Sequence, residues 1–149
     1  MPEDGKALVR RFWDEFVNQK DLDAPQKYYA RNFVWHEPDQ DMRDFAEVKR
    51  FAYMYFEAFP YVAITIEDLM LAEDDKVVSR YTCRGTHRGE TGEFSLSTGR
   101  RFELEEITIH RFEGEKMVEH WECYDNLSFV QQLDLTIDPN RPVRGLTAN

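Results

Sequence analysis

The spacing of apolar residues changes character at Pro60, near the middle of the chain. Before this residue, apolar side chains recur at intervals of three and four, which is typical of helices that bury one face. After it they alternate with polar side chains, which is typical of strands that cover a core on one side. The change predicts an α+β fold in which helices come first and a sheet follows.

Three helices and one short strand are expected before Pro60, with the helices over residues 6–19, 25–30 and 44–59 and the strand over residues 33–37. The third helix has the clearest boundaries. Asp44 and Glu47 are spaced like a capping box at its start, and Pro60 ends it.

Four strand segments are expected after Pro60, over residues 61–74, 75–89, 99–116 and 117–126. The spacing within residues 75–89 and 100–122 leaves no room for crossover helices, so the sheet is expected to be mainly antiparallel. A short helix over residues 127–133 should follow. We expect residues 1–136 to form one domain and residues 137–149 to form a tail that is loose or packed on a partner subunit.

Composition narrows the possible functions of the chain. Its 149 residues, 42% apolar and 14% aromatic, suit one domain with bulky core side chains. A net charge of −10 argues against nucleic acid as a partner. No apolar run approaches the roughly 20 residues of a membrane span, and a signal peptide is not evident, so we expect a cytoplasmic protein without membrane contact. Cys83 and Cys123 form no CxxC pair and are expected to be reduced packing residues.

Three polar residues alternate along the last strand segment, namely His120, Glu122 and Tyr124. Residues two apart on a strand share a face. If that face points inward, Glu122 loses hydration and its pKa is expected to rise. Such a carboxyl removes a proton beside a carbonyl, while His120 or Tyr124 holds the enolate. The alternatives are a surface acid on the outer face of the sheet and a buried structural Glu–His pair.

The pairing register of the last two strands decides which residues face Glu122. A loop of three residues after Glu113 places Thr108 opposite Glu122 and also pairs His110 with His120. A loop of two residues at Glu113 and Gly114 places Glu105 opposite Glu122 instead. A slip of one residue changes every facing pair.

Four segments of the chain carry a family resemblance: LVRRFWDEFVN; residues 59–90, which end in G-T-H-R-G-E; residues 97–122, which begin with S-T-G-R-R-F and end in H-W-E; and NLSFVQQL. Their order resembles the SnoaL-like polyketide cyclases, or ester cyclases, of the nuclear-transport-factor-2-like superfamily. The resemblance implies a cone in which three N-terminal helices pack on a strongly curved, mainly antiparallel sheet and enclose a pocket, and it favours the register that pairs Thr108 with Glu122. It also implies a homodimer formed through the open face of the sheet.

Cyclases of this family close a ring by an intramolecular aldol condensation without a metal or an organic cofactor. Their acid/base aspartate falls on Glu122, and a pocket histidine falls on Thr108. The chain is therefore expected to be a cofactor-free acid/base enzyme, a cyclase, isomerase or lyase, that acts on a small hydrophobic carbonyl compound. The alternatives are a non-catalytic ligand-binding protein, which the Thr108 departure favours, and a cofactor-independent hydroxylase.

The candidate catalytic residues are Glu122 and His120. The expected substrate contacts are Trp13, Phe16, Trp35, His36, Tyr55, Phe59, His87, Thr108, His110 and Tyr124. For the aromatic residues of the helices the alternative is plain core packing, and for His36 it is a polar position beside a loop. The four histidines show no HxH or HxxxH spacing, so no metal site is expected. Asp125 is expected to cap the last helix.

Overall fold

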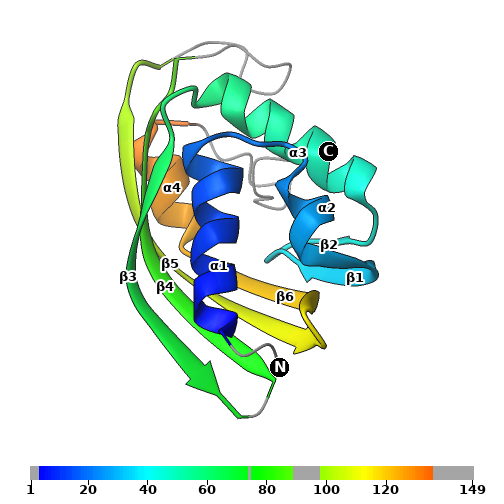
Figure 1. The fold of residues 1–149 in the computed structure, drawn as a ribbon. Helices are drawn as coiled ribbons and strands as arrows, with labels where there is room; N and C mark the ends of the chain where they lie inside the picture. The colour runs from blue at the N-terminus through cyan, green and yellow to red at the C-terminus, as the bar shows by residue number, and fades with distance from the viewer. Residues whose placement is uncertain (1–3, 74, 89–97, 136–149) are drawn as a thin grey trace.

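The computed structural model describes residues 4–73, 75–88 and 98–135, and the tail expected over residues 137–149 lies outside these ranges. The elements are α1 (Gly5–Trp13), η1 (Asp14–Asn18), α2 (Ala24–Tyr28), β1 (Tyr29–His36), β2 (Asp41–Met42), α3 (Phe45–Ala58), β3 (Ala63–Ala72), β4 (Lys76–Thr86), β5 (Arg101–Glu113), β6 (Lys116–Tyr124) and α4 (Asn126–Gln132). The strands curl into one sheet around the helices (Figure 1). The expected α+β fold is confirmed. None of the described helices is long and apolar enough to cross a membrane.

Helices α1 and α3 each begin at an aspartate cap, of which the cap at Asp44 was expected. The carboxyl of Asp4 accepts the backbone N–H of Ala7, and that of Asp44 accepts the N–H of Glu47. After Trp13 the first helix widens into the π-helical turn η1. Helix α1 packs on β3 and β4, whereas α4 packs on β5 (Figure 1). The core therefore lies between the helices and the inner face of the sheet.

The strand order is β2-β1-β6-β5-β4-β3. All neighbours pair antiparallel except β1 and β6, which run parallel. This parallel contact brings the end of β1 beside the polar half of β6, with Trp35 paired to His120. The mainly antiparallel sheet is as expected, but the short strand β2 was not.

The β5–β6 hairpin adopts the register that pairs Thr108 with Glu122 and His110 with His120. That pairing is the one expected from a three-residue loop, yet the turn is shorter: Glu113 pairs with Lys116 across two residues. A shift in the ladder after Arg111 supplies the missing residue on β6. The register is therefore confirmed, and a bulge rather than the loop length produces it.

Alternation along β5 sorts its side chains cleanly between the two faces of the sheet. The buried set points inward and consists of Phe102, Leu104, Glu106, Thr108, His110 and Phe112. The odd-numbered residues face outward. Half of this inward row is polar, and its polar residues Glu106, Thr108 and His110 pair with the polar residues Tyr124, Glu122 and His120 of β6.

Gly85 leaves space for the ring of Phe102. A Cβ at this position would lie 2.6 Å from Cε1 of Phe102, whose ring is packed edge-on against Phe59 and Phe129. We expect Gly85→Ala to lower the free energy of unfolding by about 1–3 kcal/mol, measured by denaturant titration, because the ring has no space into which to move. The double variant with Phe102→Leu should lose less than the sum of the two single losses. A neutral Gly85→Ala would show that the ring adjusts without strain.

Candidate active site

A cavity lies between the helices and the inner face of the sheet. Its walls are mainly aromatic and include Trp13, Phe16, Trp35, Phe51, Tyr55, Phe56, Tyr81, Tyr124 and Phe129. The volume within which the centre of a water molecule can move is about 80 Å³. The whole space free of protein atoms, including the open mouth, is about 690 Å³. The cavity is narrow and apolar, and it suits a small hydrophobic molecule.

Three glutamates reach this cavity from different parts of the sheet. Glu37 directly follows β1, Glu106 lies in β5 and Glu122 lies in β6. They are nearly buried, with Glu37 and Glu106 9% and 8% exposed and the side chain of Glu122 11% exposed. The carboxyl of Glu122 hydrogen-bonds to both of the others. Three charges cannot persist together in so dry a place, so this glutamate trio holds protons at neutral pH.

Glu122 is the member of the trio that neighbouring donors surround. The Tyr81 hydroxyl donates to its Oε1 at 2.9 Å, and Nε1 of Trp35 donates to its Oε2 at 3.3 Å. Nε2 of His120 lies 3.4 Å from the same Oε2. Burial alone would raise the pKa of Glu122, but hydrogen bonding to His120, the positive charge that His120 carries when protonated, and hydrogen bonding to Glu37 and Tyr81 lower it to about 2. The expected rise of this pKa is therefore wrong, and Glu122 is ionised at neutral pH.

Glu37 and Glu106 hold the protons of the trio. Burial raises the pKa of each carboxyl well above its ordinary value, and the negative charge of Glu122 raises both further. A protonated carboxyl donates its O–H. At neutral pH the cavity surface therefore carries one proton acceptor and two proton donors within a single hydrogen-bonded group.

Three polar residues expected at the substrate lie beneath the cavity floor instead. His110, His120 and Thr108 are fully buried, and none of them borders the cavity. The ring of His120 stacks on that of Trp35 with 3.9 Å between centroids, and Oγ1 of Thr108 lies 3.1 Å from the Tyr81 hydroxyl. Burial lowers the pKa of both histidines, so they are neutral at neutral pH. Their role is therefore to support the floor of the cavity.

The remaining expected contacts divide into two groups. Those that border the cavity are Trp13, Phe16, Trp35, Tyr55 and Tyr124. Phe59 and His87 do not border it, because they pack against each other at 5.4 Å between ring centroids. Burial lowers the pKa of His87 as well.

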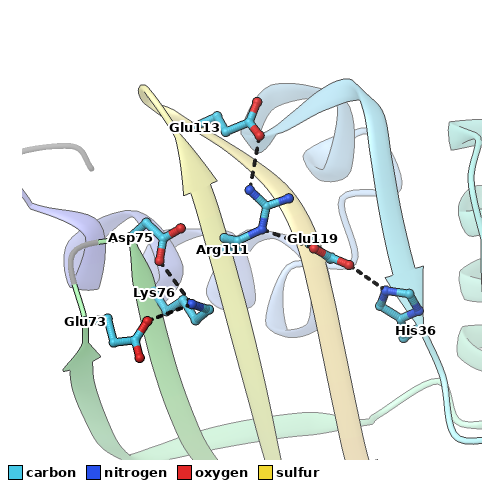
Figure 2. A network of polar contacts seen from close by, with 7 residues as sticks. All are labelled: His36, Glu73, Asp75, Lys76, Arg111, Glu113 and Glu119. Carbon is cyan, nitrogen blue, oxygen red and sulfur yellow. Dashed lines mark hydrogen bonds and ion pairs between the residues drawn. The ribbon is translucent and has the colours of Figure 1, made fainter.

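His36 points away from the cavity, on the outer face of the sheet. Its ring nitrogens lie 2.8 Å from the carboxyl of Asp41 and 2.9 Å from that of Glu119. Glu119 also accepts a hydrogen bond from Arg111, and Figure 2 shows His36, Glu119 and Arg111 in one row. The reason is the strand period: Trp35 points inward, so its neighbour points outward. The expectation that His36 contacts the substrate is therefore not met. Burial alone would lower the pKa of His36, but Glu119 and Asp41 raise it.

Residues 7–133 match the family model described as SnoaL-like polyketide cyclase. The chain belongs to this family. Among solved structures, this SnoaL-like protein is similar to AclR from Streptomyces galilaeus, a candidate hydroxylase, with 27% identity, a TM-score of 0.75, and 87% of this chain and 94% of that chain covered. A candidate polyketide cyclase from Acidithiobacillus ferrooxidans shares 27% identity, with a TM-score of 0.75 and coverage of 90% and 96%.

IdmH from Streptomyces antibioticus, a candidate polyketide cyclase, shares 25% identity with this SnoaL-like protein, with a TM-score of 0.68 and coverage of 87% and 98%. A comparison with curated proteins finds no match. The fold and the family are thus established, while the neighbours differ in the reaction for which they are named.

Sequence reasoning missed several lining residues of this SnoaL-like protein, above all Glu37 and Glu106. Glu106 could have been found from its position two residues before Thr108, because residues two apart on a strand share a face. The signal for Glu37 was its place two residues after Trp35, on the same side of the chain. Asp125 caps α4 as expected, since its carboxyl accepts the N–H of Ser128 at 2.9 Å. In the described part of the chain, no group of three histidine, cysteine or acidic residues is arranged to hold a metal ion.

Proposed function

We propose that this SnoaL-like protein is a cofactor-free acid/base enzyme that acts on a small hydrophobic carbonyl compound in the aromatic cavity. The observation that carries the proposal is the glutamate trio at the cavity surface, where neighbouring donors lower the pKa of Glu122 and burial raises the pKa of Glu37 and Glu106. Environments that separate the proton affinities of neighbouring acids define a base and an acid at one site.

In this scheme Glu122 removes a proton beside the substrate carbonyl. The enolate oxygen is stabilised by the O–H of Glu37 or Glu106, which also returns a proton to the product. Depending on the substrate, the enolate closes a ring in an aldol step, shifts a double bond or expels water. These outcomes correspond to cyclase, isomerase and lyase activity.

The low pKa of Glu122 would by itself make it a weak base. Part of that low pKa comes from hydrogen bonds to the other two glutamates. When a substrate oxygen takes the O–H of Glu37 or Glu106, Glu122 loses a donor and its proton affinity rises. Binding of the carbonyl group therefore activates the base, whereas a hydrocarbon of the same shape does not.

A second candidate function is a cofactor-independent hydroxylase, and the similarity to AclR favours it. The same base would then remove a proton from an easily oxidised substrate, which would react with oxygen. Oxygen consumption during turnover distinguishes this reaction from the redox-neutral ones.

The test is proton exchange in deuterated water. Cyclic ketones and β-keto esters small enough for the cavity are incubated with the protein, and loss of the α-proton signal is followed by NMR. We expect exchange with the wild-type chain and a strong loss with Glu122→Gln. If no carbonyl compound exchanges while the same compounds bind, the chain is a binding protein rather than an enzyme.

We also propose that two copies pair through the outer face of the sheet. Paired residues of β3 to β6 form an apolar row there, namely Met70, Val78, Ile109 and Trp121. Beside this row, Ile107 is 46% exposed, and an apolar patch of this kind favours burial against a partner.

Light scattering should therefore give twice the chain mass of 17.8 kDa. Ile107→Glu should return the monomer mass, because it places a charge in the interface without disturbing the core. Tyr53→Glu, at a 55% exposed position of α3 rather than of the sheet, is the control and should leave the dimer intact. A wild-type monomer at high concentration would remove the proposal.

A further inference from the structure

Several buried polar groups beneath the cavity have no part in the chemistry proposed above. His110, His120 and Ser79 are fully buried, and Tyr29 is 2% exposed. They come from β5, β6, β4 and β1, so four strands converge on one spot. Buried polar groups are costly unless they are hydrogen-bonded, so the pattern of these bonds matters.

The charge of Glu122 sets the direction of the bonds at one end. An ionised carboxylate only accepts, so Nε2 of His120, 3.4 Å away, carries the hydrogen. The ring is neutral, so its Nδ1 is an acceptor, and the Tyr29 hydroxyl at 2.6 Å donates to it. The oxygen of Tyr29 then accepts from Nδ1 of His110 at 3.3 Å. His110 is therefore protonated on Nδ1, and its Nε2 is an acceptor.

The opposite end is compatible with the same assignment. The indole of Trp13 is only a donor, and its Nε1 donates to Oγ of Ser79 at 3.2 Å. The Ser79 hydroxyl then points its own hydrogen at Nε2 of His110, 3.4 Å away. The Glu122 end thus requires the Nδ1–H form of His110 and the Ser79 end is satisfied by it, so that every donor along the chain points towards Glu122.

We propose that Tyr29 and His110 are positioning residues for Glu122: by hydrogen bonding they hold the buried His120 in the form that presents its N–H to the carboxylate. Tyr29 is the critical link because it is the only donor to Nδ1 of His120 that the described residues provide. Without it, Nδ1 of His120 is a buried acceptor with no donor among the described residues, so the ring is held less firmly and its N–H bond to the carboxylate weakens. The catalytic meaning rests on the proposed function, whereas the hydrogen-bond direction does not.

The charged groups around this chain are few. Glu37, directly after β1, and Glu106, in β5, face Glu122. Beyond burial, the charge of His36 on the outer face lowers the pKa of His120. On the side of α1, Trp13 supplies a neutral ring against both histidines, and Trp35 stacks on His120. The glutamate trio is therefore the group through which the chain affects protonation.

The first test needs no substrate. Long-range proton–nitrogen NMR of protein labelled in histidine reports which ring nitrogen carries the hydrogen. We expect opposite forms at neutral pH, with His120 protonated on Nε2 and His110 on Nδ1. His110 protonated on Nε2, or a doubly protonated ring at either position, would overturn the proposal.

The second test is Tyr29→Phe, with Tyr28→Phe as the matched control. Tyr28 donates to Glu15 at 2.9 Å and takes no part in the hydrogen-bonded chain, so the control also loses one tyrosine hydrogen bond. The readout is the carboxyl carbon shift of Glu122 as pH is lowered. We expect the titration midpoint to rise by about one pH unit or more in Tyr29→Phe and to stay unchanged in Tyr28→Phe, because a charge-assisted hydrogen bond to the carboxylate weakens.

Equal titration of Glu122 in both variants would show that the chain only fills the core. If Tyr29→Phe does not fold, the histidine forms of the wild-type protein still decide the question. Once an exchange substrate is known, Tyr29→Phe should lower kcat with little change in KM and move the acidic limb of the pH profile upward. Failure of the exchange assay alone would refute the enzyme proposal and leave the hydrogen-bond chain standing.

Discussion

Glu122→Gln is expected to lower turnover of the carbonyl substrate by about 10²–10⁴-fold, the usual contribution of a general base. The amide has nearly the same shape as the carboxylate, but it accepts no proton under these conditions. The substrate still meets the same aromatic walls, so its affinity should change only a few-fold. The measurement is the rate of α-proton exchange at saturating substrate, together with the Kd from titration.

Two glutamates of the neighbouring strand β5 provide a control and a comparison for this experiment. Glu105→Gln changes an outward-facing glutamate and should leave the exchange rate unchanged. Glu106→Gln retains a donor in the form of its amide and should lose less activity than Glu122→Gln. Full activity of Glu122→Gln would end the assignment of Glu122 as the base, and a greater loss in Glu106→Gln would transfer that role to Glu106.

Glu106→Gln is expected to stabilise the protein above pH 6.5. The pKa of Glu106 is raised in the folded state, chiefly by burial, so the folded chain binds a proton there that the unfolded chain releases above about pH 4.5. The stability contributed by such a group is complete below the unfolded pKa and is lost as pH rises towards the folded pKa. The loss is about 1.4 kcal/mol for each pH unit over that interval. An amide carries no such cost.

The pH range of the measurement follows from the buried histidines. The pKa values of His110 and His120 are lowered by burial, so their contribution is lost as pH falls below about 6.5 and opposes that of the acids there. Guanidinium unfolding between pH 6.5 and 9 therefore avoids the contribution of these two histidines. His36, whose pKa is raised, also loses stability as pH rises in this range, but it does so equally in the wild type and the variant. The wild-type stability should fall with pH, and the slope should be smaller in Glu106→Gln by the contribution of Glu106, while Glu37 still contributes. Parallel curves for the wild type and the variant would contradict the assigned protonation, and Glu105→Gln is the control.

Local rules explain why much of the fold could be predicted. The change from helical to alternating spacing at Pro60 and the cap at Asp44 depend on neighbours along the chain, and both are confirmed. The same alternation placed Glu122 and Tyr124 on the inner face. It failed for His36 only because Trp35, its neighbour on β1, took the inward position.

The protonation of the site depends on contacts that the sequence order does not contain. Glu37 and Glu106 are 69 positions apart in the numbering, and they meet Glu122 only because β1 and β5 lie on either side of β6. Burial considered for one residue at a time predicts a raised pKa for Glu122. Three carboxyls in one dry cavity share a single charge, and the residue with the most donors keeps it. The sequence by itself determined that Glu122 shares one strand face with His120 and Tyr124. The tertiary structure decided that this face points inward and which of three acids is ionised, because proton affinity follows the donors that the packed strands bring together.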